Sequence, residues 1–192
     1  MRCGITTVTT FGRYFLALAP DDAARDRLLA IGLPDGARPV HPLDLHLTLA
    51  FVGSLEPDGE ARILQAIDPG PPVSVHLDRL SYWPGPRVLC ATAGEAPELD
   101  ALARRLLSQL QGAGVRVDTQ PFRAHVTLAR GAKLPPAADV PLPAPILWRA
   151  TAVQLMASLG GTREASAATP RYQQRGSRAC YGGGVASSGQ SR

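Results

Sequence analysis

A five-residue pattern that occurs twice constrains this chain more than any other feature. The first copy is His46-Leu47-Thr48-Leu49-Ala50 and the second is His125-Val126-Thr127-Leu128-Ala129. One histidine placed two residues before a threonine carries little information, but two copies that share the following Leu-Ala are far rarer by chance. Each copy lies in the later strand of an expected strand–helix–strand block. The chain is therefore expected to consist of two halves of similar construction.

Hydrophobic periodicity, together with the proline and glycine residues that separate the periodic segments, predicts both strands and helices, with a hairpin in the middle of the chain. A leucine stripe at helical spacing, formed by Leu99, Leu102, Leu106 and Leu110, indicates a core-facing helix. The mixture predicts an α+β fold with mainly antiparallel sheet. The expected strands are 13–19, 45–53, 73–80, 87–93, 122–130 and 150–158, with a short edge strand at 171–174; the expected helices are 20–31, 57–67 and 97–111, and 135–145 is expected to be a proline-rich connection.

Strand geometry gives the repeated pattern a meaning. Alternate side chains face opposite ways, so the histidine, threonine and final alanine of each copy are expected on one face, with His and Thr about 6–7 Å apart. The aliphatic residues between them are expected on the buried face. That face should carry Leu45, Leu47, Leu49 and Phe51 in the first strand and Ala124, Val126 and Leu128 in the second.

Two imidazoles that face one substrate suit general acid–base catalysis, because near pH 7 one ring can accept a proton while the other donates one. The hydroxyls of Thr48 and Thr127 can donate hydrogen bonds to a phosphate oxygen, and Arg130 can neutralise its charge. These groups suffice to hydrolyse a strained cyclic phosphate or to displace an alkoxide from a phosphodiester. We therefore expect no metal and no cofactor, and we expect the four motif residues and Arg130 to form the site.

The charge of the chain bears on its partners. The formal net charge is +4, but residues 160–192 contain five arginines and one acid, so the rest of the chain is neutral. Contact with phosphate should then be local and not that of a globally basic nucleic-acid-coating protein. Three widely spaced cysteines exclude a disulfide scaffold, and no apolar run approaches membrane-spanning length. We expect a cytoplasmic protein that contacts no membrane.

At the two motifs, LHLTLAFVG and FRAHVTLAR, the sequence resembles the 2H phosphoesterases, and among them the RNA 2′,3′-cyclic phosphodiesterases once named 2′-5′ RNA ligases. The resemblance covers about Arg13 to Ser158. It implies two pseudo-symmetric lobes with antiparallel sheets around a central cleft and helices outside. It also implies hydrolysis of RNA 2′,3′-cyclic phosphate ends to 2′-phosphate ends, with reversible 2′-5′ ligation as a weaker activity and tRNA halves as candidate substrates.

By this resemblance His46 protonates the leaving 3′ oxygen, His125 activates water, and Thr48 and Thr127 hold the phosphate. Arg130 matches an arginine that often follows the second motif. The chain departs from the family at Ala124, where proline is frequent, and after Tyr172, where an apolar strand is expected but Gln-Gln-Arg-Gly-Ser-Arg follows.

Several other residues have competing interpretations. Arg123, two residues before the second histidine, is a candidate phosphate contact. His41 is expected in a loop, His76 on the surface and Cys90 in the core. The aromatic residues Tyr82, Trp83 and Trp148 could stack on bases, but core or turn packing is the favoured interpretation.

The expected organisation is an N-terminal extension at 1–12, one bilobal domain at 13–175 and a flexible Gly/Ser/Arg tail at 176–192, in a monomeric protein. Two other functions remain open from the sequence. One keeps the two-histidine chemistry but acts on a small cyclic nucleotide or ADP-ribose cyclic phosphate. The other is a non-catalytic RNA-binding module that gains affinity from the basic tail.

Overall fold

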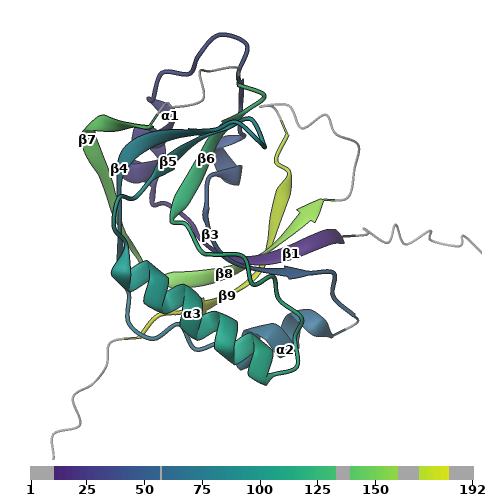
Figure 1. Cartoon of the computed structure of the whole chain (residues 1–192). Coiled ribbons are helices and arrows are strands. Elements are labelled where there is room, and N and C mark those ends of the chain that lie inside the picture. The colour runs from purple at the N-terminus through teal and green to yellow at the C-terminus, as the bar shows by residue number, and fades with distance from the viewer. Residues whose placement is uncertain (1–10, 57, 133–138, 160–168, 182–192) are drawn as a thin grey trace, which may run out of the picture.

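The computed structural model describes residues 11–56, 58–132, 139–159 and 169–181. Within them the chain forms one antiparallel sheet with helices packed against it, which confirms the α+β class (Figure 1). The strands are β1 (Phe11–Leu18), β2 (Arg38–Pro39), β3 (Leu47–Gly53), β4 (Val73–Trp83), β5 (Val88–Thr92), β6 (His125–Arg130), β7 (Asp139–Ala150), β8 (Ala152–Leu159) and β9 (Tyr172–Ala179); the helices are α1 (Asp22–Leu29), the short 3₁₀ helix η1 (Pro42–Asp44), α2 (Gly59–Ala66) and α3 (Pro97–Gly112).

The strand order shows the two expected halves. It runs β7-β4-β5-β6-β3-β1-β8-β9, so the two motif strands, β6 and β3, lie at the centre. Three further strands follow in the sheet on the outer side of each. The expected central hairpin is β4–β5. Between β3 and β6 only one residue pair is in register, Leu47 opposite Val126. The two halves therefore meet along a narrow junction at the motifs and diverge on either side of it.

The helices tie the halves together. Helix α3 packs against β3 and β4, which belong to different halves, and it lies beside α2 at one end of the molecule (Figure 1). Helix α1 follows β1 in the chain but packs against β7 of the other half, and Arg27 from its last turn donates to the carbonyl oxygen of Pro145 at 2.6 Å. The leucine stripe of α3 is buried, as predicted.

Two segments differ from the sequence-based expectation. The expected proline-rich connection at 135–145 is wrong from Asp139 onward, because β7 contains Pro141, Pro143 and Pro145. An edge strand tolerates prolines because it needs fewer ladder donors, and the β4–β7 register shifts at this stretch.

The last strand is also longer than expected. β9 pairs with β8 from Tyr172 to Ala179, so residues 176–179, which were expected to belong to the tail, are part of the sheet. Gly176 lies against Leu64 of α2, where a Cβ atom would collide with the leucine side chain. The polar residues after Tyr172 thus form the edge strand of the sheet, which is partly exposed and partly packed against α2. Residues 1–10 and 182–192 of the expected extension and tail lie outside the described residues.

Candidate active site

The register between the motif strands brings the two His-Thr pairs together. Because Leu47 lies opposite Val126 in an antiparallel pair, continuing the register places His46 across from Thr127 and Thr48 across from His125. All four side chains then lie on the face opposite to the buried Leu47 and Val126. The repeated sequence thus becomes a nearly two-fold symmetric set of side chains at the centre of the sheet.

Each motif strand carries a β-bulge at the same motif position. In β3 the pairing with β1 skips Leu49, and in β6 the pairing with β5 skips Leu128. A bulge inserts one residue and reverses the alternation beyond it. Ala50 and Ala129 are consequently buried, and the next residues, Phe51 and Arg130, turn to the His-Thr face. The expectation that Phe51 faces the core is wrong: half of its surface, 50%, is exposed.

Both histidines line one cleft, as predicted. This His cleft has a volume of about 410 Å³, and among the described residues that line it there is neither Asp nor Glu. Cationic and neutral donor groups surround it on both sides of the central junction. It is lined by Arg13, Phe15, His46, Thr48, Phe51, Trp83, Pro86, Val88, His125, Thr127, Arg130, Ser158, Arg171 and Tyr172.

His46 is half-buried, and its Nδ1 lies 2.6 Å from the carbonyl oxygen of Asp44. Because a carbonyl can only accept, Nδ1 carries a proton, and in the neutral ring Nε2 is left as the acceptor for the cleft. The pKa of His46 is lowered from 6.5 to about 4, chiefly by burial and also by the charges of His125 and Arg130, while the hydrogen bond to the Asp44 carbonyl opposes the shift. At neutral pH this ring is therefore neutral.

His125 repeats this arrangement in the other half. Its Nδ1 lies 2.7 Å from the carbonyl oxygen of Arg123, again two residues earlier in the chain. Burial lowers the pKa of His125, and Arg130 lowers it further. Both rings are therefore held in the same tautomer by equivalent backbone contacts.

The phosphate-binding candidates are distributed unevenly. Thr48, Thr127 and Arg130 line the His cleft as predicted, and the Nε atom of Arg130 is buried with no hydrogen-bond partner in the described part of the chain. Such a buried cation favours an anionic ligand.

Arg123 is placed differently. It precedes β6, so strand alternation does not apply to it, and its exposed side chain lines neighbouring cavities and not the His cleft. Its backbone carbonyl orients His125, which the sequence did not indicate.

Aromatic side chains that the sequence analysis did not place in the site surround both imidazoles. The ring centroids of Phe15 and Tyr172 lie 4.8 Å and 5.1 Å from that of His46, and Tyr172 meets it edge-on. On the other side, Trp83 lies 4.6 Å from His125. Trp83, at the end of β4 before the hairpin turn, thus packs against a motif histidine, whereas Tyr82 and Trp148 are buried as expected.

Asp44 links the first histidine to the last strand. Its carboxylate is buried and accepts hydrogen bonds from the backbone N–H groups of Arg171 (3.0 and 2.8 Å) and Tyr172 (3.2 Å). Burial raises the pKa of Asp44, although these bonds oppose the shift. The Asp44 side chain therefore fixes Tyr172 against the ring that the Asp44 carbonyl orients. An acid two residues before the motif histidine was the available sequence signal.

The remaining candidate residues, His41, His76 and Cys90, do not line the His cleft. His41 caps η1 by accepting from the N–H of Leu43, and His76 is exposed on β4. Cys90 is buried, 3.8 Å from the Thr127 hydroxyl, and burial raises the pKa of its thiol to about 11. Among the described residues no group of three or more His, Cys, Asp or Glu side chains could hold a metal ion, and no helix is long and apolar enough to cross a membrane.

The chain is similar to known proteins in both sequence and fold. Residues 17–162 match the family described as the 2′-5′ RNA ligase superfamily, which covers most of the chain. The chain therefore belongs to the 2′-5′ RNA ligase superfamily. A curated relative named RNA 2′,3′-cyclic phosphodiesterase, from Archaeoglobus fulgidus, is 30% identical over 138 residues, which span 67% of this chain and 78% of the relative.

Other relatives agree. A protein of the same name from Escherichia coli is 35% identical over 102 residues, 52% of this chain and 58% of that protein. Among solved structures, Escherichia coli LigT in its apo form has a TM-score of 0.73 and 27% identity, covering 89% of this chain and 99% of that chain. The structure of TT0787 from Thermus thermophilus has a TM-score of 0.69 and 26% identity, covering 90% of this chain and 100% of that chain.

Proposed function

We propose that this protein hydrolyses the 2′,3′-cyclic phosphate ends of RNA to 2′-phosphate ends by acid–base catalysis with His46 and His125. The observation that carries the proposal is the pair of imidazoles in one cleft, each with Nδ1 bonded to a backbone carbonyl and Nε2 left for the substrate. The names of the relatives from Archaeoglobus fulgidus and Escherichia coli support the same substrate.

The reaction conserves atoms and protons. His125 accepts a proton from water, the water oxygen forms a bond to phosphorus, and the bond between phosphorus and O3′ breaks. His46, in its protonated form, donates a proton to the departing O3′. The phosphate remains on O2′. Thr48, Thr127 and Arg130 bind the non-bridging oxygens, where negative charge increases in the transition state.

The negative charge of the substrate phosphate favours the protonated form that His46 needs in order to act as the acid. Burial and the charge of Arg130 lower the pKa of both rings. A bound phosphate anion has the opposite sign to Arg130 and favours the protonated form of a nearby imidazole. Protonation of His46 is thus coupled to the arrival of the cyclic phosphate.

The same geometry supports ligation as a second outcome. If the 5′-hydroxyl of another RNA strand replaces water, attack on phosphorus with loss of O3′ gives a 2′-5′ phosphodiester. Halves of a cleaved tRNA carry the two required ends and are candidate substrates. We propose further that the protein is monomeric and cytoplasmic and that it needs no cofactor.

The direct test compares turnover of an oligonucleotide with a 2′,3′-cyclic phosphate end and of a cyclic mononucleotide. His46→Ala and His125→Ala should each lower kcat about 10²–10⁴-fold, the usual contribution of a positioned acid or base. Thr48→Ala and Thr127→Ala should lower it less, and the product should be a 2′-phosphate. Full activity in either histidine variant would falsify the assignment. RNA binding without turnover would favour the binding-module alternative, and turnover of the mononucleotide alone would favour the small-nucleotide alternative.

Removal of metal ions gives a separate prediction. The acid, the base and the anion-binding donors are all side chains of this chain, so activity should persist in EDTA. The measurement is the initial rate before and after dialysis against EDTA, with a metal-dependent nuclease as the positive control. A loss that Mg²⁺ restores would contradict the mechanism.

A further inference from the structure

A second cavity lies beside the His cleft. This side hollow has a volume of about 530 Å³ and lies between β3, helix α3 and residues 118–123. It shares Thr48, Phe51, Trp83 and His125 with the His cleft, so the two cavities adjoin each other. Its volume falls within the range of about 300–1,000 Å³ that is usual for small-ligand sites.

The lining of the side hollow suits a nucleobase better than an anion. Phe51, which the bulge turns outward, and the half-buried Phe122 and Leu107 provide flat and apolar surface. Two arginines, Arg104 and Arg123, are accompanied by two acids, Asp100 and Asp118, and by the polar side chains of Thr119 and Gln120. Carboxylates repel a phosphate but accept hydrogen bonds from the donor groups of a base. Aromatic faces add stacking that is independent of base identity.

One wall of the side hollow is held in place by backbone contacts. The N–H of Asp118 donates to the carbonyl oxygen of Phe51 at 3.1 Å, and the Asp118 carboxylate accepts from the N–H of Gln120 at 3.0 Å. The loop after α3 is therefore fixed to the same strand that carries Thr48. A hollow with such a wall exists before the ligand arrives, which reduces the entropy cost of binding.

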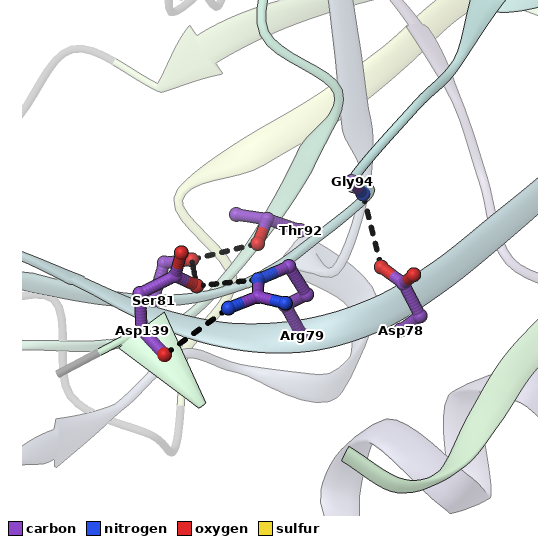
Figure 2. A network of polar contacts seen from close by, with 6 residues as sticks. All are labelled: Asp78, Arg79, Ser81, Thr92, Gly94 and Asp139. Carbon is purple, nitrogen blue, oxygen red and sulfur yellow. Dashed lines mark hydrogen bonds and ion pairs between the residues drawn. The ribbon is translucent and has the colours of Figure 1, made fainter. Parts of the chain in front are cut away.

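A larger outer hollow, about 640 Å³, lies beyond Trp83, but four of the polar side chains that line it already bond to one another. Ser81 bonds to Thr92 (2.7 Å) and to Asp139 (2.9 Å), and Arg79 donates to the same carboxylate (2.9 Å), as Figure 2 shows. These contacts hold the start of β7 on β4 and β5. The outer hollow therefore offers fewer free groups to a ligand than the side hollow does.

We propose, on the basis of the function proposed above, that the side hollow binds the base of the penultimate nucleotide, the one joined to the 5′ side of the terminal nucleotide that carries the cyclic phosphate. A 2′,3′-cyclic phosphate marks the 3′ end of a strand, so the substrate can continue only in the 5′ direction. Arg123, exposed between the side and outer hollows, then binds the phosphodiester that joins the two nucleotides. This subsite makes the protein an enzyme of RNA strands in preference to mononucleotides.

The test compares kcat/KM for three substrates of the wild-type protein. These are a 2′,3′-cyclic mononucleotide, the dinucleotide that ends in it, and the same dinucleotide without its 5′ base. The complete dinucleotide should exceed the abasic one by about tenfold, the scale of one base-stacking contact. The abasic dinucleotide should still exceed the mononucleotide, because it retains the phosphodiester.

Arg123→Gln isolates the phosphate contact and keeps the backbone carbonyl that orients His125. It should lower kcat/KM for both dinucleotides more than for the mononucleotide. Arg62→Gln on α2 is the matched control, since it removes an exposed helical arginine that lines none of the three cavities, and it should change no value.

The outcomes separate the subsite from the chemistry. Equal kcat/KM for all three substrates would overturn the subsite and leave the proposed hydrolysis intact. Equal losses for the three substrates in Arg123→Gln would overturn the role of Arg123. No turnover of any substrate would overturn the proposed function, on which the subsite depends.

Discussion

Arg130 is the residue whose charge acts on both histidines. It lowers the pKa of His46 and of His125, and in each ring it adds to the effect of burial. Replacing it with glutamine removes a positive charge, so the pKa of both rings should rise. The profile of kcat/KM against pH reports the free protein, and both of its limbs should move to higher pH in Arg130→Gln.

The same substitution should lower kcat/KM at the optimum by about tenfold to a hundredfold, because a charged donor to the phosphate is lost. Arg62→Gln again serves as the control and should leave the position of both limbs unchanged. Limbs that stay in place in Arg130→Gln would mean that this guanidinium does not act on the imidazoles.

At the scale of single residues, much of the His cleft follows from the sequence and some does not. Strand alternation correctly places His46 and Thr48 on one face, because no irregularity intervenes between them. Alternation fails at Phe51, because it cannot foresee a bulge. Asp44 and Tyr172 were missed for another reason: their contact joins segments more than 120 residues apart, and no local pattern encodes it.

The contact between η1 and β9 gives a prediction at the scale of elements. In Asp44→Asn the side chain keeps its size but offers only one acceptor oxygen, while its NH₂ faces a backbone N–H of Arg171 or Tyr172. Leaving one buried donor unsatisfied should lower the free energy of unfolding by about 1–3 kcal/mol. Because Tyr172 packs on His46, kcat should fall as well. Thermal unfolding and steady-state kinetics measure the two effects.

Asp35→Asn is the matched control, since it changes the same group at an exposed turn. It should leave stability and kcat unchanged. If Asp44→Asn loses stability but keeps full kcat, the carboxylate holds the strand without any influence on the histidine.

Elements were predictable where their pattern is local. The β4–β5 hairpin and the leucine face of α3 follow from short-range periodicity. β7 was not predicted, and β9 was predicted only in its first residues, because prolines and polar residues argue against strands when only the local sequence is considered. Each gains its stability from one neighbouring strand and one helix: β7 from β4 and α1, and β9 from β8 and α2. Tertiary context overrides propensity in both cases.

At the scale of the whole molecule, the end of β9 connects distant parts of the chain. Beyond the pairing with β8, the N–H of Tyr181 donates to the carbonyl oxygen of Gly70 at 2.9 Å, and its hydroxyl donates to Asp68. Earlier in β9, Arg175 donates to Glu60 of α2, which also accepts from Tyr14 of β1. These contacts join the last strand to three other parts of the chain.

Truncation measures this contribution. A chain that ends after Arg175 should have a lower Tm than a chain that ends after Tyr181, because it lacks the second half of β9 and the Tyr181 contacts. The expected difference is about 2–4 °C for each 1 kcal/mol lost in a protein of this size. Equal Tm values would show that residues 176–181 add nothing to the fold.

The three prolines of β7 have a consequence for how copies of this protein meet one another in solution. Along Pro141, Pro143 and Pro145 every second residue lacks an N–H, and Arg27 already occupies the carbonyl oxygen of Pro145. A strand from a second copy that approached residues 141–145 of this edge would find no N–H donor at every second position and so could not form a complete ladder there. The prolines therefore disfavour edge-to-edge aggregation along the stretch that follows the exposed Val140.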